Sequence, residues 1–422
     1  MIVPLPPRLR GLVAADGSWV KADVFVDPAI YELELDKIFS RCWLLLCPES
    51  EIPKPGDFFA TYMGEDPVLV VRQNDGSVVA LLNQCRHRGA ALCRSDQGNL
   101  KAFTCTYHGW SYDMSGKLIA VPGEDKNFDQ PVDRERWSAR RVPRVTIDNG
   151  LILGCFDEHA PSFRESLGDA EWYFDAMFGL TERPLVAVPG VFKWKIHGNW
   201  KLPAEQFTTD GYHFPISHIS ALTALAAEAK DAPRKPRRTP TYLFTNDFGH
   251  GASVTTDPES LRSMAPNIDA FELLLRETAV AKVGSVRARG IQITHANFFP
   301  TLSYLPQHHT LRVWHPRGVD HVEVFAWTMV EPDAPEPVRE ERRLNTGRQF
   351  GSMGIFEQDD AANWGDVQRT VRGRNARKTE LNYMMGRAGT HPDLPGETQL
   401  VYSEEGGRKM YRRWLELLTA GE

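Results

Sequence analysis

Two short motifs constrain this chain more than any other feature of its sequence. Cys85-Arg-His87 comes first, and Cys105-Thr-Tyr-His108-Gly109-Trp110 follows, with residues 88–104 between them. Each motif follows a strand-like run, 78–83 and 102–104, so each is expected at the tip of a hairpin. Two Cys and two His on neighbouring loops can close four bonds to one inorganic centre.

Two centres fit these four side chains. Zinc accepts two thiolates and two imidazoles, but zinc fingers usually place both Cys together and both His together, whereas here each loop supplies one of each. A Rieske [2Fe-2S] cluster needs that mixture, because two Cys hold one iron and two His hold the other. Gly109 allows close backbone approach and Trp110 provides an apolar cover. The pattern favours the Rieske cluster, with structural zinc or a chance arrangement as alternatives.

Size, charge and cysteine usage set the bounds for the rest. At 422 residues the chain predicts two domains, or one domain with a large insertion. Its formal charge of 49 − 55 = −6 provides no basic field for nucleic acid. No apolar run reaches membrane-spanning length and MIVPLPPRLRGLV lacks a signal-peptide layout, so we expect a cytoplasmic protein. Four further cysteines show no disulfide-framework spacing and are expected to be reduced: Cys42, Cys47, Cys93 and Cys155.

The order of patterns along the chain predicts three regions. Asp27 can cap a helix that starts at Pro28 and runs to about Phe39. Short strands follow up to about Phe156, and these include 57–62, 67–72 and 77–82, the last two joined by a turn at 74–76. Beyond this all-β region, a helical pattern covers 161–178 and strands resume at 185–197.

A second candidate site begins at His213 and His218. On an ideal helix, positions five apart are rotated by about 140° and would not converge on a metal. Pro215 disfavours helical geometry at Phe214 and should break the preceding helix, so both imidazoles can turn toward one point. Two ordinary core or surface histidines are an equal alternative.

A carboxylate would complete the set of two His and one carboxylate that non-haem iron oxygenases use. The candidates are Asp359 and Asp360, within the stretch 350–364. Taken alone, this pair is typical of a helix start, where a carboxylate caps free amides. Spacing does not choose between the two residues.

These motifs, in this order, resemble the large (α) subunit of Rieske non-haem iron aromatic-ring-hydroxylating dioxygenases, above all the biphenyl, naphthalene and toluene dioxygenase group. The resemblance covers nearly the whole chain. It is carried by the cluster motif, the 199–218 and 350–364 stretches, Tyr31-Glu-Leu-Glu-Leu35, Leu81-Leu-Asn-Gln-Cys85 and Tyr411-Arg-Arg-Trp-Leu-Glu-Leu-Leu418.

The resemblance implies an α+β fold with a small all-β Rieske [2Fe-2S] domain, residues 41–156, inserted in a helix-grip (START-like) catalytic domain. That domain would comprise 1–40, with the N-terminal helix, and 157–422, with a curved antiparallel sheet and the mononuclear iron. The cluster ligands would be Cys85, His87, Cys105 and His108. The Fe(II) ligands would be His213, His218 and Asp360, the last preferred because the family uses the second Asp of the pair.

Asp210 matches the family's bridging aspartate, which links an iron-ligating His to a Rieske His, here His108, of the partner subunit. A carboxylate between two imidazoles would orient both ligands and provide a short route for electrons. The bridge implies a trimer of α subunits. The C-terminal segment 408–418 resembles those that also bind a small β subunit, which favours α3β3, although it can equally be an amphipathic surface helix.

The matching pocket positions predict the lining of an apolar substrate cavity. Gln206 stands where many relatives have Asn, and Phe214 and Thr301 fall at positions that vary with substrate. No matched position holds Arg or Lys, which favours a neutral aromatic substrate, although Arg276, Arg287 or Arg289 could reach in. The predicted lining is Gln206, Phe207, Gly211, Phe214, Thr301, Phe350 and Phe356.

Segments and histidines outside the matched positions are given ordinary roles. The basic run 232–240 is interpreted as a solvated entrance loop rather than a nucleic-acid patch. Structural or surface roles are expected for His159, His197, His250, His295, His308, His309, His315, His321 and His391.

The implied activity is that of the terminal oxygenase of a multicomponent dioxygenase in aromatic hydrocarbon catabolism. Both atoms of O2 would be added to an aromatic ring to give a cis-dihydrodiol. NAD(P)H electrons would come through a separate reductase, with or without a ferredoxin, because the chain has no dinucleotide-binding glycine fingerprint. Alternatives are a monohydroxylating or salicylate-type relative acting on an aromatic acid, a Rieske electron-transfer protein, and an apolar-ligand carrier.

Overall fold

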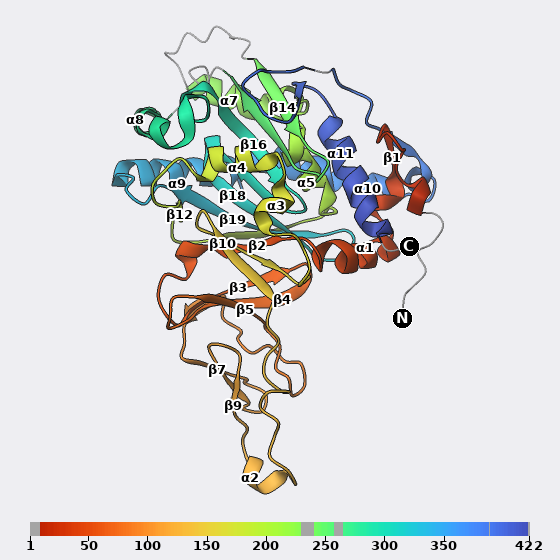
Figure 1. Cartoon of the computed structure of the whole chain (residues 1–422). Helices are drawn as coiled ribbons and strands as arrows, with labels where there is room; N and C mark the ends of the chain where they lie inside the picture. The colour runs from red at the N-terminus through yellow and green to blue at the C-terminus, as the bar shows by residue number, and fades with distance from the viewer. Residues whose placement is uncertain (1–8, 229–239, 257–264, 388, 421–422) are drawn as a thin grey trace. The chain divides into compact units, whose positions relative to one another are not determined.

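The computed structural model describes residues 9–228, 240–256, 265–387 and 389–420 (Figure 1). It divides into one unit formed by Met1–Ile38 with Pro161–Glu422 and a second formed by Phe39–Ala160. The run 232–239, interpreted above as an entrance loop, lies outside the described residues. None of the six cysteines forms a disulfide, in agreement with the expectation that Cys42, Cys47, Cys93 and Cys155 are reduced.

The Phe39–Ala160 unit is an all-β assembly of three small antiparallel sheets. One has the order β10-β11-β2, another β5-β4-β3-β6 and the third β7-β8-β9. The predicted hairpin forms with Val71 opposite Val79, because Asn74-Asp-Gly76 supplies the turn between two apolar strands. The strands are β2 (Leu44–Pro48), β3 (Asp57–Met63), β4 (Asp66–Arg72), β5 (Val78–Leu82), β6 (Gln97–Asn99), β7 (Ala102–Thr104), β8 (Ser111–Asp113), β9 (Leu118–Ala120), β10 (Arg144–Asp148) and β11 (Leu151–Cys155).

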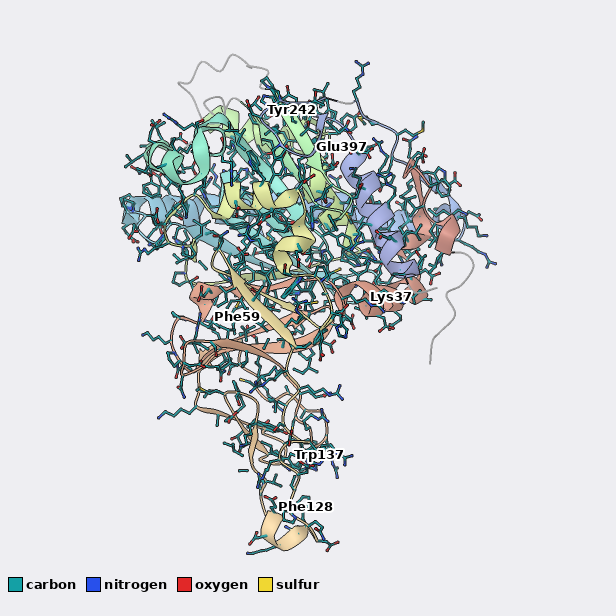
Figure 2. All side chains as sticks on the ribbon, in the orientation of Figure 1. Lys37, Phe59, Phe128, Trp137, Tyr242 and Glu397 are labelled. Atoms are coloured by element: carbon teal, nitrogen blue, oxygen red, sulfur yellow. The ribbon has the colours of Figure 1, made fainter. Side chains whose placement is uncertain are left out.

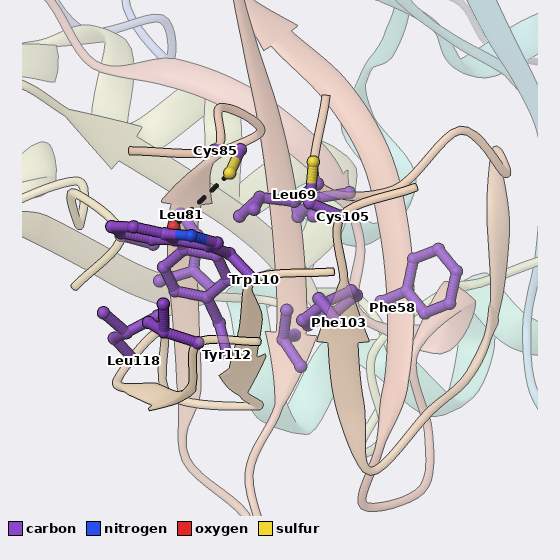
Figure 3. Close-up of a cluster of buried hydrophobic side chains, with 13 residues drawn as sticks. Phe58, Leu69, Leu81, Cys85, Phe103, Cys105, Trp110, Tyr112 and Leu118 are labelled. Atoms are coloured by element: carbon purple, nitrogen blue, oxygen red, sulfur yellow. Dashed lines mark hydrogen bonds between the residues drawn. The ribbon is translucent and has the colours of Figure 1, made fainter. Parts of the chain in front are cut away.

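A compact apolar core supports this unit, and its buried members include Phe58, Leu81 and Phe103 together with both motif cysteines (Figure 3). The chain then extends past a short helix, α2 (Glu124–Asn127), to Trp137, whose ring is covered by the guanidinium groups of Arg86 and Arg136 (Figure 2).

The larger unit is built on a nine-stranded antiparallel sheet. Its order is β12-β19-β18-β17-β16-β15-β14-β21, and β13 also pairs with β19. Tyr242 and Glu397 mark the β14–β21 edge in Figure 2. The strands are β12 (Val186–Ala187), β13 (Phe192–Ile196), β14 (Thr241–Thr245), β15 (Gly251–Thr255), β16 (Gln292–Phe298), β17 (Leu302–Leu305), β18 (Thr310–Pro316), β19 (Val322–Val330) and β21 (Glu397–Leu400), with β1 (Trp19–Lys21) and β20 (Glu380–Asn382) forming a separate pair.

Helices pack on this sheet and on one another. The helix α5 contacts β14 through β17, α11 packs against α5, and α9 contacts both α8 and α10. The helices are α1 (Pro28–Glu34), α3 (Phe163–Leu167), α4 (Ala170–Phe178), α5 (Lys201–Thr209), α6 (Phe214–Ser217), α7 (Ile219–Glu228), α8 (Pro266–Ser285), α9 (Glu336–Phe350), α10 (Ile355–Val371) and α11 (Glu405–Thr419). The predicted α+β class, with an all-β domain and a large antiparallel sheet with helices, is confirmed.

Charged side chains deep in this unit anchor α5. Glu34 on α1 accepts hydrogen bonds from Lys201 (2.5 Å), Trp200 (2.7 Å) and Trp414 (2.8 Å), and both charged side chains are fully buried. A buried charge is tolerated only when it is paired and hydrogen-bonded. This cluster therefore fixes the position of α5 relative to α1 and α11.

Candidate metal centres and substrate cavity

The two cysteine-histidine motifs fold into loops of the same shape. In the first, Cys85 N donates to the Ala90 carbonyl at 2.7 Å and Gly89 N to the Cys85 carbonyl at 2.9 Å. In the second, Cys105 N donates to Trp110 and Gly109 N to Cys105, both at 2.9 Å. Gly89 (φ 79°) and Gly109 (φ 75°) adopt the left-handed conformation that closes each loop.

Only the second loop is a hairpin tip, since Thr104 pairs with Ser111 across it. The hairpin expected around the first motif is wrong, because β5 pairs with β4 and not with the next strand, β6. The fourteen residues between β5 and β6, 83–96, carry the chain past β4 and β3, and the apolar pattern of β5 alone does not predict this crossover.

In the second unit, the two motif cysteines are buried and the two motif histidines face each other, and these donor atoms fit a mixed sulfur and nitrogen centre. Cys85 and Cys105 are each only 2% exposed, and the Nδ1 atoms of His87 and His108 face each other at 3.2 Å. Two facing ring nitrogens can share at most one proton, so the pair is better satisfied by a metal. Burial and the neighbouring charges of His108 and Arg88 lower the pKa of His87, which favours the neutral imidazole that ligation needs.

Two aromatic residues pack around these ligands. The Trp110 ring stacks on His87, with ring centroids 5.0 Å apart and planes inclined by 6°. The Tyr112 hydroxyl lies 3.5 Å from Cys85 Sγ and accepts a hydrogen bond from Arg86 N at 3.0 Å (Figure 3). A phenol that already accepts from a backbone amide has its own proton available for the sulfur.

The second centre lies in the larger unit, where α5 ends. The helix stops at Thr209, Asp210 caps it, and α6 starts at Phe214. The expected break at Pro215 is therefore misplaced. Pro215 lies in the first turn of α6, where its missing N–H costs no hydrogen bond, and the irregular segment 210–213 makes the turn.

His213, His218 and Asp360 form a group whose ligand atoms all lie within 4.8 Å of one another. Asp360 Oδ1 lies 3.5 Å from His213 Nε2 and 3.3 Å from His218 Nε2. That oxygen is buried and has no hydrogen-bond partner among the described residues. An orphaned carboxylate oxygen facing two imidazole nitrogens is an arrangement that a divalent iron would satisfy.

A further carboxylate stands behind each histidine. Asp210 Oδ2 lies 3.2 Å from His213 Nδ1, and Asp359 Oδ2 lies 3.1 Å from His218 Nδ1. The His213 contact is an ion-pair distance without hydrogen-bond geometry. Carboxylates in such positions orient metal-binding histidines, and with a metal at Nε2 each would keep the proton on Nδ1. The two acidic residues of the pair thus differ in position, and this supports Asp360 as the ligand. Neither is a helix cap, because α10 begins at Ile355.

The electrostatics of Asp210 and His213 favour charge on both. Burial alone would raise the pKa of Asp210, but hydrogen bonds and charge from His213 outweigh burial and lower it. Burial alone would lower the pKa of His213, but Asp210 and Asp360 outweigh it and raise it. Asp210 Oδ1 also accepts hydrogen bonds from the backbone amides of Tyr212 (3.0 Å) and His213 (3.1 Å), which fix its orientation.

A buried arginine fixes the position of α10, the helix that carries Asp360. Arg312 on β18 donates to Glu357 at 2.5 Å and to the Phe350 carbonyl at 2.6 Å, and it is fully buried. Glu357 lies one turn before Asp360 on α10, so this contact sets the position of the ligand-bearing turn. No pattern in the sequence predicted this contact.

A cavity of about 360 Å³ opens onto this centre. Five of the seven predicted lining residues border it, namely Gln206, Phe207, Gly211, Phe214 and Phe350. Thr301 and Phe356 do not, although the Phe356 ring packs against His218 with centroids 5.0 Å apart.

None of the three arginines considered above borders the cavity. Arg276 instead donates to the Ala288 and Ile291 carbonyls, and Arg289 pairs with Glu277. Sequence reasoning missed several lining residues that come from the sheet and its connections: Thr241, Ser253, Thr255, Thr294, His295, Leu305, Gln307, Val401 and Tyr402. His295, for which the sequence predicts only a structural or surface role, is one of these lining residues.

Comparison with known proteins agrees with this construction. A family described as "Ring hydroxylating alpha subunit (catalytic domain)" matches residues 163–420, and "Rieske [2Fe-2S] domain" matches residues 42–142. The biphenyl dioxygenase subunit alpha of Paraburkholderia xenovorans (strain LB400) is 42% identical, covering 98% of this chain and 94% of that protein. A benzene 1,2-dioxygenase subunit alpha of Pseudomonas putida is 43% identical, covering 94% of this chain and 90% of that protein.

Solved structures give the same result. Naphthalene 1,2-dioxygenase with indole bound in the active site has a TM-score of 0.90 at 32% identity, covering 97% of this chain and 94% of that one. A quaternary ammonium Rieske monooxygenase, 16% identical with a TM-score of 0.68, shares the fold. No helix in the described part of the chain has the length and apolarity needed to cross a membrane.

A Rieske [2Fe-2S] domain combined with a His-His-Asp mononuclear iron site defines a Rieske non-haem iron oxygenase. Within that class, the chain belongs to the alpha subunits of aromatic-ring-hydroxylating dioxygenases, the terminal oxygenase components. This assignment sets aside the zinc, electron-carrier and ligand-carrier interpretations.

Proposed function

We propose that this subunit binds a neutral aromatic molecule in the cavity beside His213, His218 and Asp360 and converts it to a cis-dihydrodiol. The observation that carries the proposal is the lining of the cavity. Aromatic side chains border it next to the three ligands, and none of its lining residues in the described chain is Arg or Lys. An aromatic carboxylate would need such a cation once it left water.

The residue assignments form part of this proposal. Cys85, His87, Cys105 and His108 would hold the cluster, and His213, His218 and Asp360 would hold the iron. When bound, the cluster supplies single electrons and the iron supplies the site where O2 is activated. The ring takes both oxygen atoms of O2 together with two electrons and two protons, so the electrons must come from outside this chain.

The chain's own groups then have defined tasks. Phe207, Phe214 and Phe350 border the cavity and would contact the ring, which would set which two adjacent carbons lie nearest His213, His218 and Asp360. Asp210 and Asp359, which lie beside the Nδ1 atoms of His213 and His218, would orient the two rings. Gln206 is itself held by Trp364, whose Nε1 donates to Gln206 Oε1 at 2.8 Å.

The assembly is proposed on the family resemblance. Asp210 would bridge His213 to His108 of the partner subunit in a trimer of α subunits, and a small β subunit would complete α3β3. A reductase, with or without a ferredoxin, would deliver electrons from NAD(P)H. The domain limits proposed are 41–156 for the Rieske domain and 1–40 with 157–422 for the catalytic domain.

Single-turnover product analysis tests the proposed reaction. Anaerobically reduced holoenzyme would be mixed with O2 and a panel of neutral aromatics and aromatic acids, and products separated by mass and stereochemistry. We expect a cis-dihydrodiol that carries two ¹⁸O atoms from ¹⁸O2 with neutral rings. Product only from aromatic acids, or only monohydroxylated product, would move the assignment to a salicylate-type hydroxylase.

A further inference from the structure

One wall of the cavity is polar, and this is unexpected for a hydrocarbon site. Every lining residue contributed by strands β14, β15 and β16 carries a hydroxyl or an imidazole. Elsewhere the lining includes Phe207, Phe214, Phe350, Leu305 and Val401, all apolar. The polar wall, as it is called below, consists of Thr241, Ser253, Thr255, Thr294 and His295.

Strand pairing explains why these residues stand together. Thr241 is opposite Thr255, and Ser253 is opposite His295. Between Ser253 and Val254 the register shifts, so that Val254 pairs with Ile293 and Thr294 becomes an extra residue on β16. In a regular strand, Thr294 and His295 would point to opposite faces; a β-bulge lets two consecutive side chains border the same cavity.

Two members of the polar wall make only weak hydrogen bonds within the chain. Thr294 Oγ1 lies 3.4 Å from the Ser253 carbonyl and 3.4 Å from His295 Nδ1. Both distances are longer than the usual 2.5 to roughly 3.0 Å of an O–H hydrogen bond. His295 Nε2 is buried with no hydrogen-bond partner among the described residues.

The polar wall carries no charge of its own. Burial lowers the pKa of His295 to about 4, so its imidazole is neutral near pH 7, and the other four members are hydroxyls. Hydroxyls and a neutral imidazole can both donate and accept hydrogen bonds, but they cannot neutralise a carboxylate. They therefore match an uncharged oxygen group on the ligand.

A plain hydrocarbon would leave these groups buried against carbon. Burying a hydroxyl without a partner costs free energy, and Val, Ala or Leu at the same positions would serve a hydrocarbon better. From these observations we infer that the cavity selects a neutral aromatic ring that bears a hydroxyl or carbonyl oxygen, and that this oxygen hydrogen-bonds to the polar wall. The inference rests on the proposed function and narrows its substrate class.

The test compares two substrates of nearly equal size, 2-naphthol and 2-methylnaphthalene, with the complete electron-supplying system. The quantity measured is the ratio of kcat/KM for the hydroxyl substrate to kcat/KM for the methyl substrate, counting all oxygenated products. Thr255→Val and Ser253→Ala remove hydroxyls with little change of volume. We expect each to lower the ratio by about five- to tenfold, the effect of losing one hydrogen bond to substrate.

A matched control is available on the same sheet. Thr245 on β14 is also a buried Thr, but it does not border the cavity and its hydroxyl has no hydrogen-bond partner among the described residues. Thr245→Val should leave the ratio as in the unmodified protein. A ratio that stays constant in both Thr255→Val and Ser253→Ala would overturn the inference.

Failure of the inference and failure of the proposed function give different results. Oxygenated product from both substrates with an unchanged ratio refutes the polar-wall inference alone. Absence of product from both refutes the proposed function. Calorimetric dissociation constants of the anaerobic holoenzyme for the same two compounds then decide the inference: a hydroxyl preference that Thr255→Val and Ser253→Ala diminish supports it, and equal binding overturns it.

Discussion

The two metal centres use histidine in opposite ways. At the cluster site, loops present two imidazoles near the surface, His108 exposed and His87 half-buried, while the sulfurs are buried. At the iron site, helices hold His218 and Asp360 with side chains 2% exposed and His213 with 20%. An exposed imidazole edge suits electron exchange with another protein surface, whereas a buried triad suits chemistry on an organic molecule shielded from water.

The groups that contact the histidines also differ between the two sites. Each histidine of the iron site has a carboxylate at its Nδ1, and the helix α10 is pinned by Arg312. In the described chain, no carboxylate lies within ion-pair distance of His87 or His108, and the support is instead a stacked Trp110 and the Tyr112 hydroxyl. Carboxylates make imidazoles more basic and hold an electron-poor iron, while neutral support leaves the cluster easier to reduce.

Asp359 and Asp360 are adjacent on α10, so the support of a histidine and the third ligand can be removed separately. This pair gives the sharpest test of the difference between the two metal sites. Asp360→Asn removes the carboxylate that lies between the two Nε2 atoms, so we expect loss of the mononuclear iron, a fall from three irons per chain to two, and no product. Asp359→Asn is the matched variant, because it keeps the ligand and removes only the support at His218 Nδ1. Iron affinity should then fall by roughly 10- to 100-fold. Iron analysis with a competing chelator measures both, and equal losses in the two variants would contradict their separate roles.

Asp210 should separate metal binding from electron supply. With Asp210→Ala, His213 loses its partner at Nδ1 but keeps its place at the end of the segment 210–213. We expect both metals to remain bound and steady-state turnover to fall by at least about 100-fold, the upper end for loss of a supporting carboxylate. Asp366→Ala, which removes an exposed carboxylate of α10 paired with Arg369, is the control and should retain activity. Normal turnover of the Asp210 variant would refute the bridge.

Glu205 links the stability of the iron-bearing unit to pH. It accepts hydrogen bonds from Tyr383 (2.9 Å) and Tyr411 (2.6 Å), but burial raises its pKa to about 7 despite them. Between its ordinary pKa of 4.5 and 7 the folded state holds a proton that the unfolded chain has lost, so stability falls as pH rises through this window and levels off above it.

Glu205→Gln keeps a carbonyl acceptor and cannot ionise. It should therefore raise the free energy of unfolding by about 2 to 3 kcal/mol at pH 8 and by much less near pH 5. Denaturant unfolding of the holoenzyme at the two pH values measures the difference. A gain in the free energy of unfolding of equal size at both pH values would show that Glu205 is ionised at both. The pH dependence that distinguishes the iron-bearing unit would then be absent.

The sequence predicted the features that depend on residues close together in the chain better than those that depend on contacts between distant segments. The cluster loops were predictable because their ligands are two or three residues apart and follow apolar strands. The pairing of His213 and His218 with Asp360 joins distant segments, and only family resemblance selected Asp360 over Asp359. The polar wall could not be predicted from the sequence. The register shift that brings Thr294 and His295 to one side arises from strand pairing and produces no periodic pattern in the sequence. Thr301, matched to the pocket by resemblance, is not among the residues that border the cavity.

The smallest effect is expected at the cluster, where neutral support replaces carboxylates. Tyr112→Phe removes the hydroxyl 3.5 Å from Cys85 Sγ and leaves the ring in the core. A hydrogen bond to sulfur stabilises the reduced cluster more than the oxidised one, because reduction adds negative charge, so the potential should drop. One hydrogen bond of about 1 kcal/mol corresponds to roughly 40 mV for one electron.

Redox titration of the holoenzyme followed by its visible spectrum measures the shift, and Tyr173→Phe is the control, since it removes a buried phenol of the other unit that donates to the Pro395 carbonyl. A drop in potential with the iron content unchanged would show that the cluster is tuned by neutral donors, as its surroundings indicate. An unchanged potential would mean that the Tyr112 proton serves the fold of the Cys85 loop, and the contrast between the two centres would then rest on the carboxylates of the iron site alone.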